Sequence, residues 1–167
     1  MARRPAALSA IRLLVLDVDG VLTDGRLRYG PQGELEKVFH VRDGHGIKAL
    51  AQAGILIAVI SGRKSQAVVH RCAELGINEV NLGVSDKDAA FTALIARLGI
   101  DARECACVGD DTPDVALMRR VGLAIAVADA HRDARLAAHR RTRLPGGYGA
   151  VREVCDWLLA ARARAGR

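Results

Sequence analysis

Short apolar runs alternate with longer amphipathic stretches along the chain. Five apolar runs each have the length of one buried strand: residues 11–16, 55–60, 79–82, 104–108 and 123–127. Two intervening stretches carry apolar residues at the spacing of one helix face: Phe91, Leu94, Ile95 and Leu98 in one, and Val68, Val69, Cys72 and Leu75 in the other. Strands that alternate with helices in this way form βαβ units. We therefore predict an α/β fold with a Rossmann-like, doubly wound parallel sheet.

One segment interrupts this alternation. Residues 26–40 alternate polar and apolar positions on either side of the turn sequence Gly30-Pro31-Gln32-Gly33, which is typical of a β-hairpin. The segment follows the first predicted strand, and loops near strand ends often carry function. The sequence does not decide between two interpretations of this hairpin, a flap that gates access of substrate and a plain hairpin at the edge of the sheet.

Composition limits the class of protein. A chain of 167 residues suits one domain, expected over residues 1–167. Half of the residues are hydrophobic but only 3% are aromatic, so Ala, Val, Leu and Ile must fill the core, as in buried parallel strands. The four cysteines form neither a C-x-x-C pair nor a zinc pattern, which favours reduced core residues in a cytoplasmic protein. No apolar run is long enough to span a membrane.

The net charge of +6 arises largely from arginines near the ends of the chain. A nucleic-acid-binding surface usually adds aromatic residues for base stacking, and these are scarce here. We therefore expect no nucleic-acid partner. A basic balance also attracts a small phosphorylated acid.

Asp17 and Asp19 follow the apolar run 11–16 directly. The ligand crevice of an open α/β sheet lies at the carboxyl ends of its strands, so we expect both side chains in a site. One carboxylate can attack phosphorus, and a second can protonate the leaving alcohol and later activate water. Two carboxylates facing a phosphate need a divalent cation, and oxygen ligands favour Mg²⁺. A calcium loop fails on spacing, because Val21 and Leu22 stand where an EF-hand needs Asp or Asn and Gly.

Three further polar groups stand where a predicted strand gives way to a helix. Ser61 follows the second strand, Lys87 opens the predicted helix that carries Phe91, and Asp110 follows the fourth strand. Each has an ordinary explanation alone, since Ser61 can be an N-cap and Thr112 an N-cap followed by Pro113 at the first helical position. Their order along the chain, together with the two aspartates, is the signal.

This order resembles the haloacid dehalogenase superfamily of phosphatases. The resemblance implies that Asp17 is the nucleophile and Asp19 the general acid and base. It implies that Ser61 and Lys87 bind the phosphoryl oxygens. It also implies that Mg²⁺ is held by Asp17, Asp110 and the backbone carbonyl of Asp19. Two further aspartates of the same loop are expected to orient the metal ligands or to cap the helix: Asp111 and Asp114.

Three longer runs of sequence resemble one family within this superfamily, the 3-deoxy-D-manno-octulosonate 8-phosphate phosphatases: residues 39–47, 61–65 and 146–156. The similarity extends over about residues 11–159. The resemblance implies hydrolysis of that 8-phosphate through an aspartyl-phosphate, in lipopolysaccharide precursor synthesis, by a homotetramer of uncapped subunits. The stretches 20–60 and 62–86 are indeed too short for a separate cap domain. Two alternatives stay open: a phosphatase of a sialic-type 9-phosphate and a non-catalytic oligomerisation module.

Two features bear on substrate recognition. An arginine fork pairs well with a carboxylate, so we expect Arg63 to bind that of the substrate, although a surface arginine is the alternative. In the C-terminal tail, about residues 144–167, Tyr148 stands where the family often has arginine. The neighbouring glycines permit close backbone approach to a site, and residues 151–158 carry an apolar helical stripe. We expect a chain truncated at Gly146 to remain folded.

Overall fold

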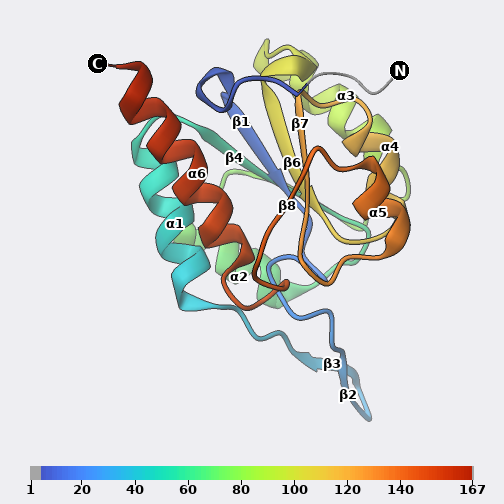
Figure 1. Cartoon of the computed structure of the whole chain (residues 1–167). Coiled ribbons are helices and arrows are strands. Elements are labelled where there is room, and N and C mark those ends of the chain that lie inside the picture. The colour runs from blue at the N-terminus through green and yellow to red at the C-terminus, as the bar shows by residue number, and fades with distance from the viewer. Residues whose placement is uncertain (1–4, 167) are drawn as a thin grey trace.

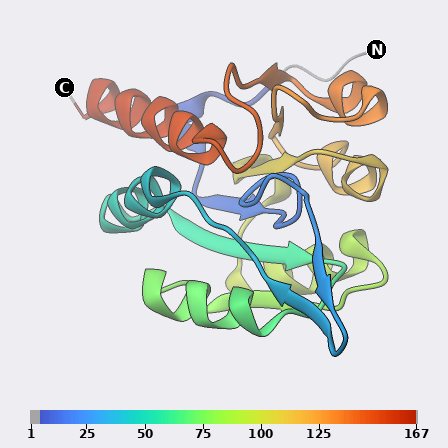
Figure 2. The same ribbon diagram turned by 90° about the horizontal axis from the view of Figure 1, so that it is seen from below.

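The computed structural model describes residues 5–166 and contains a six-stranded parallel sheet between two layers of helices (Figures 1 and 2). The strands run in the order β5-β4-β1-β6-β7-β8. Their bounds are Leu13–Leu16 (β1), Leu56–Ser61 (β4), Glu79–Leu82 (β5), Cys105–Gly109 (β6), Leu123–Ala126 (β7) and Arg140–Arg141 (β8). The predicted doubly wound α/β fold is confirmed, and each predicted strand agrees to within two residues. Only residues 1–4 and 167 of the predicted domain lie outside the described range.

Helices cover both faces of the sheet. One layer holds Val41–Gln52 (α1), Gln66–Leu75 (α2) and Ala150–Ala165 (α6), and the other holds Lys87–Leu98 (α3), Val115–Met118 (α4) and Arg132–Ala137 (α5) (Figure 2). Short 3₁₀ turns span Leu8–Ala10, Ala102–Glu104 and Thr112–Asp114. Gly76 and Gly99 adopt the left-handed conformation that ends α2 and α3.

Two capping alternatives from the sequence are wrong. Ser61 is the last residue of β4, and Ser65 is the residue that precedes α2. Asp111, not Thr112, caps the turn that leads into α4, because its carboxylate accepts a hydrogen bond from the Thr112 N–H at 2.7 Å. Pro113 is therefore the second residue of that segment and not the first.

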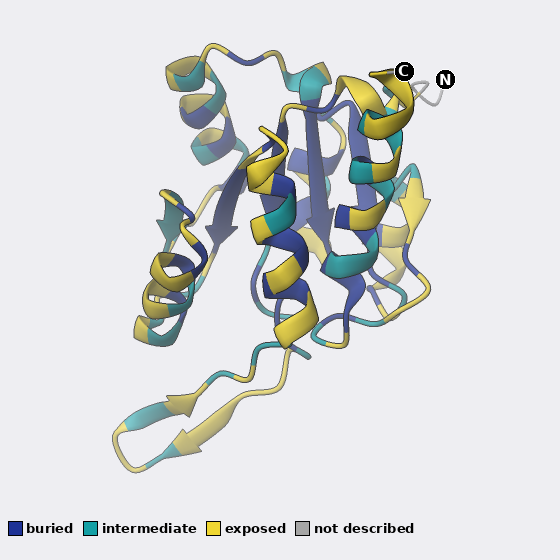
Figure 3. Ribbon diagram, turned by 90° about the vertical axis from the view of Figure 1, so that its left-hand side faces the viewer, coloured by how far each residue is buried: buried dark blue, intermediate teal, exposed yellow. Residues whose placement is uncertain are grey.

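The core lies where the strands meet the two helix layers. Every residue of β1, β6 and β7 is buried, because helices cover both sides, and this explains why these runs are continuously apolar (Figure 3). The four cysteines are buried and unpaired, as predicted: Cys72, Cys105, Cys107 and Cys155. No helix in the described range 5–166 has the length and hydropathy to cross a membrane.

The carboxyl ends of the central strands meet at one edge. Leu16 pairs with Val59 of β4 and with Val108 of β6. The residues at the ends of these three strands therefore lie together, and they include the predicted site residues Asp17, Ser61 and Asp110. The opposite edge carries both described ends of the chain (Figure 1).

A β-hairpin projects from this carboxyl edge. Its strands are Arg28–Gly30 (β2) and Gly33–Glu36 (β3), which lie within the predicted segment 26–40 (Figures 1 and 3). The hairpin is mostly exposed, with Tyr29 at 61% and Leu35 at 67%. The sequence therefore correctly predicted a hairpin in this segment.

The C-terminal helix is part of the core. The apolar stripe of α6 is fully buried: Ala150, Val151, Val154, Cys155 and Leu158. The carboxylate of Asp43 on α1 accepts a hydrogen bond from the Arg152 N–H of α6 at 2.7 Å. Truncation at Gly146 would expose the side of α1 that α6 covers, so the structure argues against the expectation that the truncated chain stays folded.

Candidate active site

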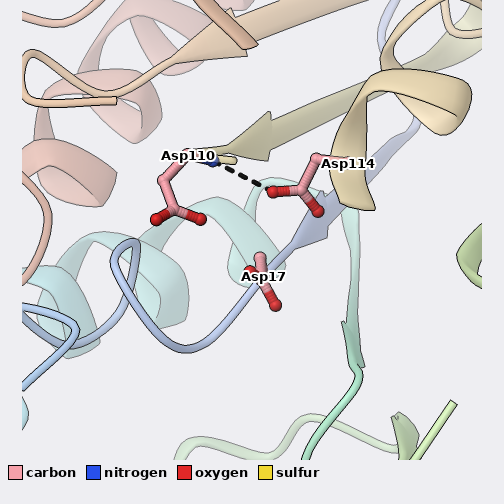
Figure 4. Close-up of side chains that lie close together, drawn as sticks. All are labelled: Asp17, Asp110 and Asp114. Carbon is pink, nitrogen blue, oxygen red and sulfur yellow. Dashed lines mark hydrogen bonds between the residues drawn. The ribbon is translucent and has the colours of Figure 1, made fainter. Parts of the chain in front are cut away.

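Asp17 lies directly after β1, and its N–H donates to the Val108 carbonyl at 3.2 Å. Lys87, the first residue of α3, brings its Nζ to 2.9 Å from Asp17 Oδ1 and to 2.7 Å from Asp114 Oδ1. These three side chains are at most 10% exposed. Asp110 joins them from the end of β6 (Figure 4). We call this group the Lys87 cluster: Asp17, Lys87, Asp110 and Asp114.

Asp114 connects the lysine to the loop after β6. Its Oδ2 accepts hydrogen bonds from the N–H groups of Asp110 at 3.0 Å and Asp111 at 3.4 Å (Figure 4). A Cβ at Gly109 would come within 2.6 Å of the Asp114 Cβ, so only glycine allows this close packing. Asp114 thus orients both Lys87 and the loop that carries Asp110.

The cluster holds more negative than positive charge. Burial and the neighbouring Asp114 raise the pKa of Asp17 to about 6. Burial, followed by the nearby Asp17, raises the pKa of Asp110 to about 8. Carboxylate oxygens of Asp17, Asp110 and Asp114 lie within 4.8 Å of one another. Three hard oxygen donors around one lysine fit a small divalent cation such as Mg²⁺, which would stabilise their ionised forms.

The loop between Asp17 and Gly25 approaches this cluster closely. Gly20 has φ +86°, and a Cβ there would meet Asp110 Oδ2 at 2.0 Å. The C-terminal tail supports the loop from the other side, because the Gly147 N–H donates to the Val21 carbonyl at 3.0 Å. A Cβ at Gly146 would come within 1.7 Å of the Gly20 oxygen. The tail glycines therefore approach a site closely, as predicted, and that site belongs to the same chain.

The carboxylate of Asp19 belongs to a second group, formed with the hairpin. Lys37 Nζ donates to Asp19 Oδ1 and lies 3.4 Å from Glu34 Oε1. Arg63 Nη2 donates to Glu34 Oε2 at 2.8 Å, and its Nε lies 3.7 Å from Asp19 Oδ2. We call this group the Lys37 cluster: Asp19, Glu34, Lys37 and Arg63. Its carboxylates are more exposed than those of Asp17 and Asp114, with Asp19 at 20% and Glu34 at 17%.

The structure brings most of the predicted site residues to one edge. Asp17, Lys87 and Asp110 are in one cluster, and Asp19 begins the other. Ser61 is buried at the end of β4, where its Oγ accepts a hydrogen bond from the Arg63 N–H at 3.4 Å. Arg63 itself is occupied by hairpin groups, since it also donates to the Tyr29 hydroxyl at 3.0 Å.

Sequence reasoning missed Glu34 and Lys37. Both lie on the returning half of the hairpin, in a stretch that reads as ordinary charged edge residues. Their three-residue spacing was the only signal in the sequence. It was not enough, because their contact with Asp19 depends on how the hairpin packs against the loop that carries Asp19. The side chain of Lys37 is only 1% exposed as a result.

Arginines gather around a groove beside the tail. The groove has a volume of about 900 Å³ and is bordered by Tyr148, Gly149 and several arginines: Arg42, Arg140, Arg141, Arg143 and Arg152. It lies apart from both clusters, none of whose residues line it. The basic charge noted in the sequence is thus concentrated next to the turn that supports the Asp17–Gly25 loop.

Comparison with known proteins agrees with this geometry. A family model described as haloacid dehalogenase-like hydrolase matches residues 76–144. The chain is 50% identical over 154 residues to the 3-deoxy-D-manno-octulosonate 8-phosphate phosphatase KdsC of Escherichia coli strain K12, a match that covers 92% of this chain and 82% of the relative. The corresponding protein of Salmonella typhi is 49% identical over the same length.

Solved structures of proteins with the same name have closely similar folds. The 3-deoxy-D-manno-octulosonate 8-phosphate phosphatase of Yersinia pestis superposes with a TM-score of 0.91 at 45% identity, over 95% of this chain and 86% of that one. The Moraxella catarrhalis protein of the same name, solved with magnesium ion, phosphate ion and a KDO molecule, has a TM-score of 0.91 at 41% identity. That match covers 94% of this chain and 90% of the other.

Proposed function

Because the chain belongs to the 3-deoxy-D-manno-octulosonate 8-phosphate phosphatase family of haloacid dehalogenase-like hydrolases, we propose that it hydrolyses this 8-phosphate to the free sugar acid and phosphate. The observation that carries the proposal is the Lys87 cluster, in which a buried carboxylate lies in contact with a lysine at the ligand edge of the sheet. The reaction serves lipopolysaccharide precursor synthesis.

Asp17 is the proposed nucleophile and Asp19 the proposed acid and base. A carboxylate oxygen of Asp17 attacks the phosphorus, and the bond from phosphorus to the ester oxygen breaks while Asp19 gives that oxygen a proton. A water then attacks the phosphorus of the aspartyl-phosphate, and Asp19 takes a proton from it. Phosphate leaves, and Asp17 is restored as a carboxylate.

Lys87 and Ser61 are the proposed phosphoryl-binding groups. The Lys87 ammonium contacts Asp17 Oδ1 at 2.9 Å, so it lies close to the oxygens of a phosphoryl group transferred to Asp17. Phosphoryl transfer spreads negative charge over those oxygens, and fixed positive groups stabilise it. Ser61 would add a hydroxyl donor from the end of β4.

Asp17, Asp110 and the backbone carbonyl of Asp19 are the proposed Mg²⁺ ligands. The three carboxylates whose oxygens lie within 4.8 Å of one another fit a hard divalent cation, and Asp114 is available nearby to orient them. When bound, the ion neutralises charge on the nucleophile and the phosphoryl group. The raised pKa values of Asp17 and Asp110 indicate how poorly the cluster tolerates ionisation without a cation.

Arg63 is proposed to bind the substrate carboxylate. Its side chain is 40% exposed beside the hairpin, and its buried Nε has no hydrogen-bond partner in the described range. The hydrogen bonds to Glu34 and Tyr29 hold the fork in place while leaving part of it available. A bidentate arginine contact would then select a sugar acid over a neutral sugar phosphate.

We further propose that one domain spans residues 1–167 and that it works as a cytoplasmic homotetramer. The hairpin exposes apolar side chains that a monomer would leave in water: Leu27, Tyr29, Leu35 and Val38. Exposed apolar residues on a projecting hairpin favour burial against another subunit. A neighbouring subunit would also help exclude water from an active site that has no cap domain.

Phosphate release from a panel of sugar-acid phosphates tests the function. We expect turnover of the octulosonate 8-phosphate in Mg²⁺, loss of turnover after chelation, and recovery when Mg²⁺ is added back. Ca²⁺ should restore little activity, because its looser coordination misplaces the phosphoryl group relative to Asp17. A preference for a nine-carbon 9-phosphate, or no turnover of any phosphomonoester, would contradict the proposal.

A further inference from the structure

Lys37 occupies an unusual position for a hairpin residue. Its side chain is 1% exposed although it belongs to a projecting segment, and a buried ammonium requires charged or polar partners. Its partners are the two carboxylates of the Lys37 cluster: Oδ1 of Asp19 and Oε1 of Glu34 at 3.4 Å. The lysine therefore connects the hairpin to the residue proposed as general acid and base.

Glu34 is in turn fixed on its other side. Its Oε2 accepts from Arg63 Nη2 at 2.8 Å, and its Oε1 accepts from Ser65 Oγ at 3.1 Å. The hydrogen bond from Arg63 lowers the pKa of Glu34, which keeps this carboxylate ionised next to Lys37. Groups at the start of α2 thus hold Glu34, and Glu34 helps to hold Lys37.

The two oxygens of Asp19 have different surroundings. Oδ1 is occupied by Lys37, whereas Oδ2 is buried and has no hydrogen-bond partner in residues 5–166. Arg63 Nε, also buried and without a hydrogen-bond partner in that range, lies 3.7 Å from it. The direct hydrogen bond from Lys37 is therefore the contact that fixes the Asp19 carboxylate.

We propose that Lys37, held by Glu34, is a positioning residue for Asp19. Its ammonium binds Oδ1 and so holds the Asp19 carboxyl in one orientation for proton exchange with the ester oxygen and then with water. The inference rests on the proposed function, because it concerns the acid and base of the same reaction. It adds that this residue is oriented by the hairpin and not by the sheet.

A structural role for Lys37 makes a different prediction. If Lys37 only attaches the hairpin to the domain, its loss should affect all phosphomonoesters alike. If it positions the acid, the loss should depend on how much the leaving group needs a proton. Phenyl phosphate and para-nitrophenyl phosphate separate these cases, because they have similar shapes and differ in leaving-group acidity.

The experiment compares kcat/KM of the full-length wild type and Lys37→Met for both aryl phosphates in Mg²⁺. The value reports steps up to formation of the aspartyl-phosphate, so later water attack does not enter. We expect Lys37→Met to lose about tenfold to a hundredfold on phenyl phosphate and less than about threefold on para-nitrophenyl phosphate. Glu34→Gln should show the same selectivity with a smaller loss, because Lys37 remains.

Arg28→Met is the matched control. Arg28 also forms an ion pair on the hairpin, at 2.8 Å from Glu36 Oε1, but both side chains are more than half exposed and neither contacts Asp19. We expect this variant to keep wild-type kcat/KM on both substrates. Size-exclusion chromatography and thermal unfolding of all variants show whether assembly or folding has changed.

Equal losses on the two aryl phosphates, no loss, or a gain on phenyl phosphate would each overturn the proposal. If Lys37→Met does not fold, the comparison rests on Glu34→Gln, which retains the lysine. Failure of the proposed function is distinguishable, because it appears in the wild type alone, as no turnover of any phosphomonoester or as a preference for a nine-carbon 9-phosphate.

Discussion

The Lys87 cluster and the Lys37 cluster both pair a lysine with an aspartate proposed to act in the reaction, but different parts of the molecule build them. Lys87 comes from a helix packed on the sheet, and its partners follow two central strands. Lys37 comes from a hairpin that projects away from the sheet. The proposed nucleophile is thus held by the core, whereas the proposed acid and base is held by an appended segment. The comparison predicts that the two functions can be lost separately.

The largest effect should come from Asp17→Asn in the Lys87 cluster. An amide has the shape of a carboxylate but cannot serve as the nucleophile, so kcat should fall by at least about 10⁴-fold on every phosphomonoester. Phosphate release and near-wild-type circular dichroism provide the measurement and its control. If Asp17→Asn kept a kcat above about one hundredth of the wild-type value, Asp17 would not be the nucleophile and the comparison of the two clusters would fail.

Asp19→Asn in the Lys37 cluster should abolish proton transfer but leave the nucleophile in place. Sugar-acid phosphate turnover should fall by about 10²- to 10⁴-fold, because proton transfer is lost in both steps. With para-nitrophenyl phosphate, whose leaving group needs little help, the variant should release about one nitrophenol per site in a burst and then stall at the aspartyl-phosphate. Rapid-mixing absorbance measures this burst. Its absence would mean that Asp19 is also needed to form the intermediate from an activated ester.

Arg63→Ala should have a smaller effect that is specific to the substrate acid. Loss of a charge-assisted contact typically removes about 1.5–3 kcal/mol, so KM for the sugar-acid phosphate should rise roughly tenfold or more. KM for phenyl phosphate, which has no carboxylate, should change much less. Equal changes would show that Arg63 only supports Glu34 within the Lys37 cluster.

The smallest effect is on protein stability, and it should arise from the carboxylates of the Lys87 cluster alone. Because the folded-state pKa values of Asp17 and Asp110 are raised, their ionisation destabilises the metal-free protein as pH rises from about 4 to about 8. Mg²⁺ binds the ionised forms, so the increase in Tm on adding it should be a few degrees larger at about pH 9 than at about pH 5. Differential scanning fluorimetry measures this difference. An equal or larger increase at the lower pH would be inconsistent with carboxylate ligands of raised pKa.

The two clusters also differ in how far the sequence could reveal them. Asp17, Lys87 and Asp110 each follow or open a regular element, so the alternation of strands and helices was enough to bring them to one edge. Glu34 and Lys37 depend on how the hairpin folds back, and period-2 patterning carries no information about that direction. The two-residue strand β8 was missed because the run 140–141 is made of exposed arginines.

The same limit applies to the C-terminal tail. Its glycines predicted a close approach and its apolar stripe predicted a packed helix, and both were correct. The sequence did not show that α6 completes the core, because an apolar stripe of this kind can equally anchor a detachable tail. Burial of all five stripe residues against the rest of the domain decides between the two.

The contact between Gly147 and Val21 has a consequence for the order of folding. The first strand and its loop leave the ribosome long before the backbone that supports the loop, because Gly147 lies far along the chain from Val21. Contacts between such distant parts of a chain form late and slow the search for the native state. A nascent chain that already carries Asp17, Lys87 and Asp110 should therefore remain inactive until α6 is released and docks. Synthesis through α6, and not the presence of the proposed catalytic side chains, would then determine when the enzyme becomes active.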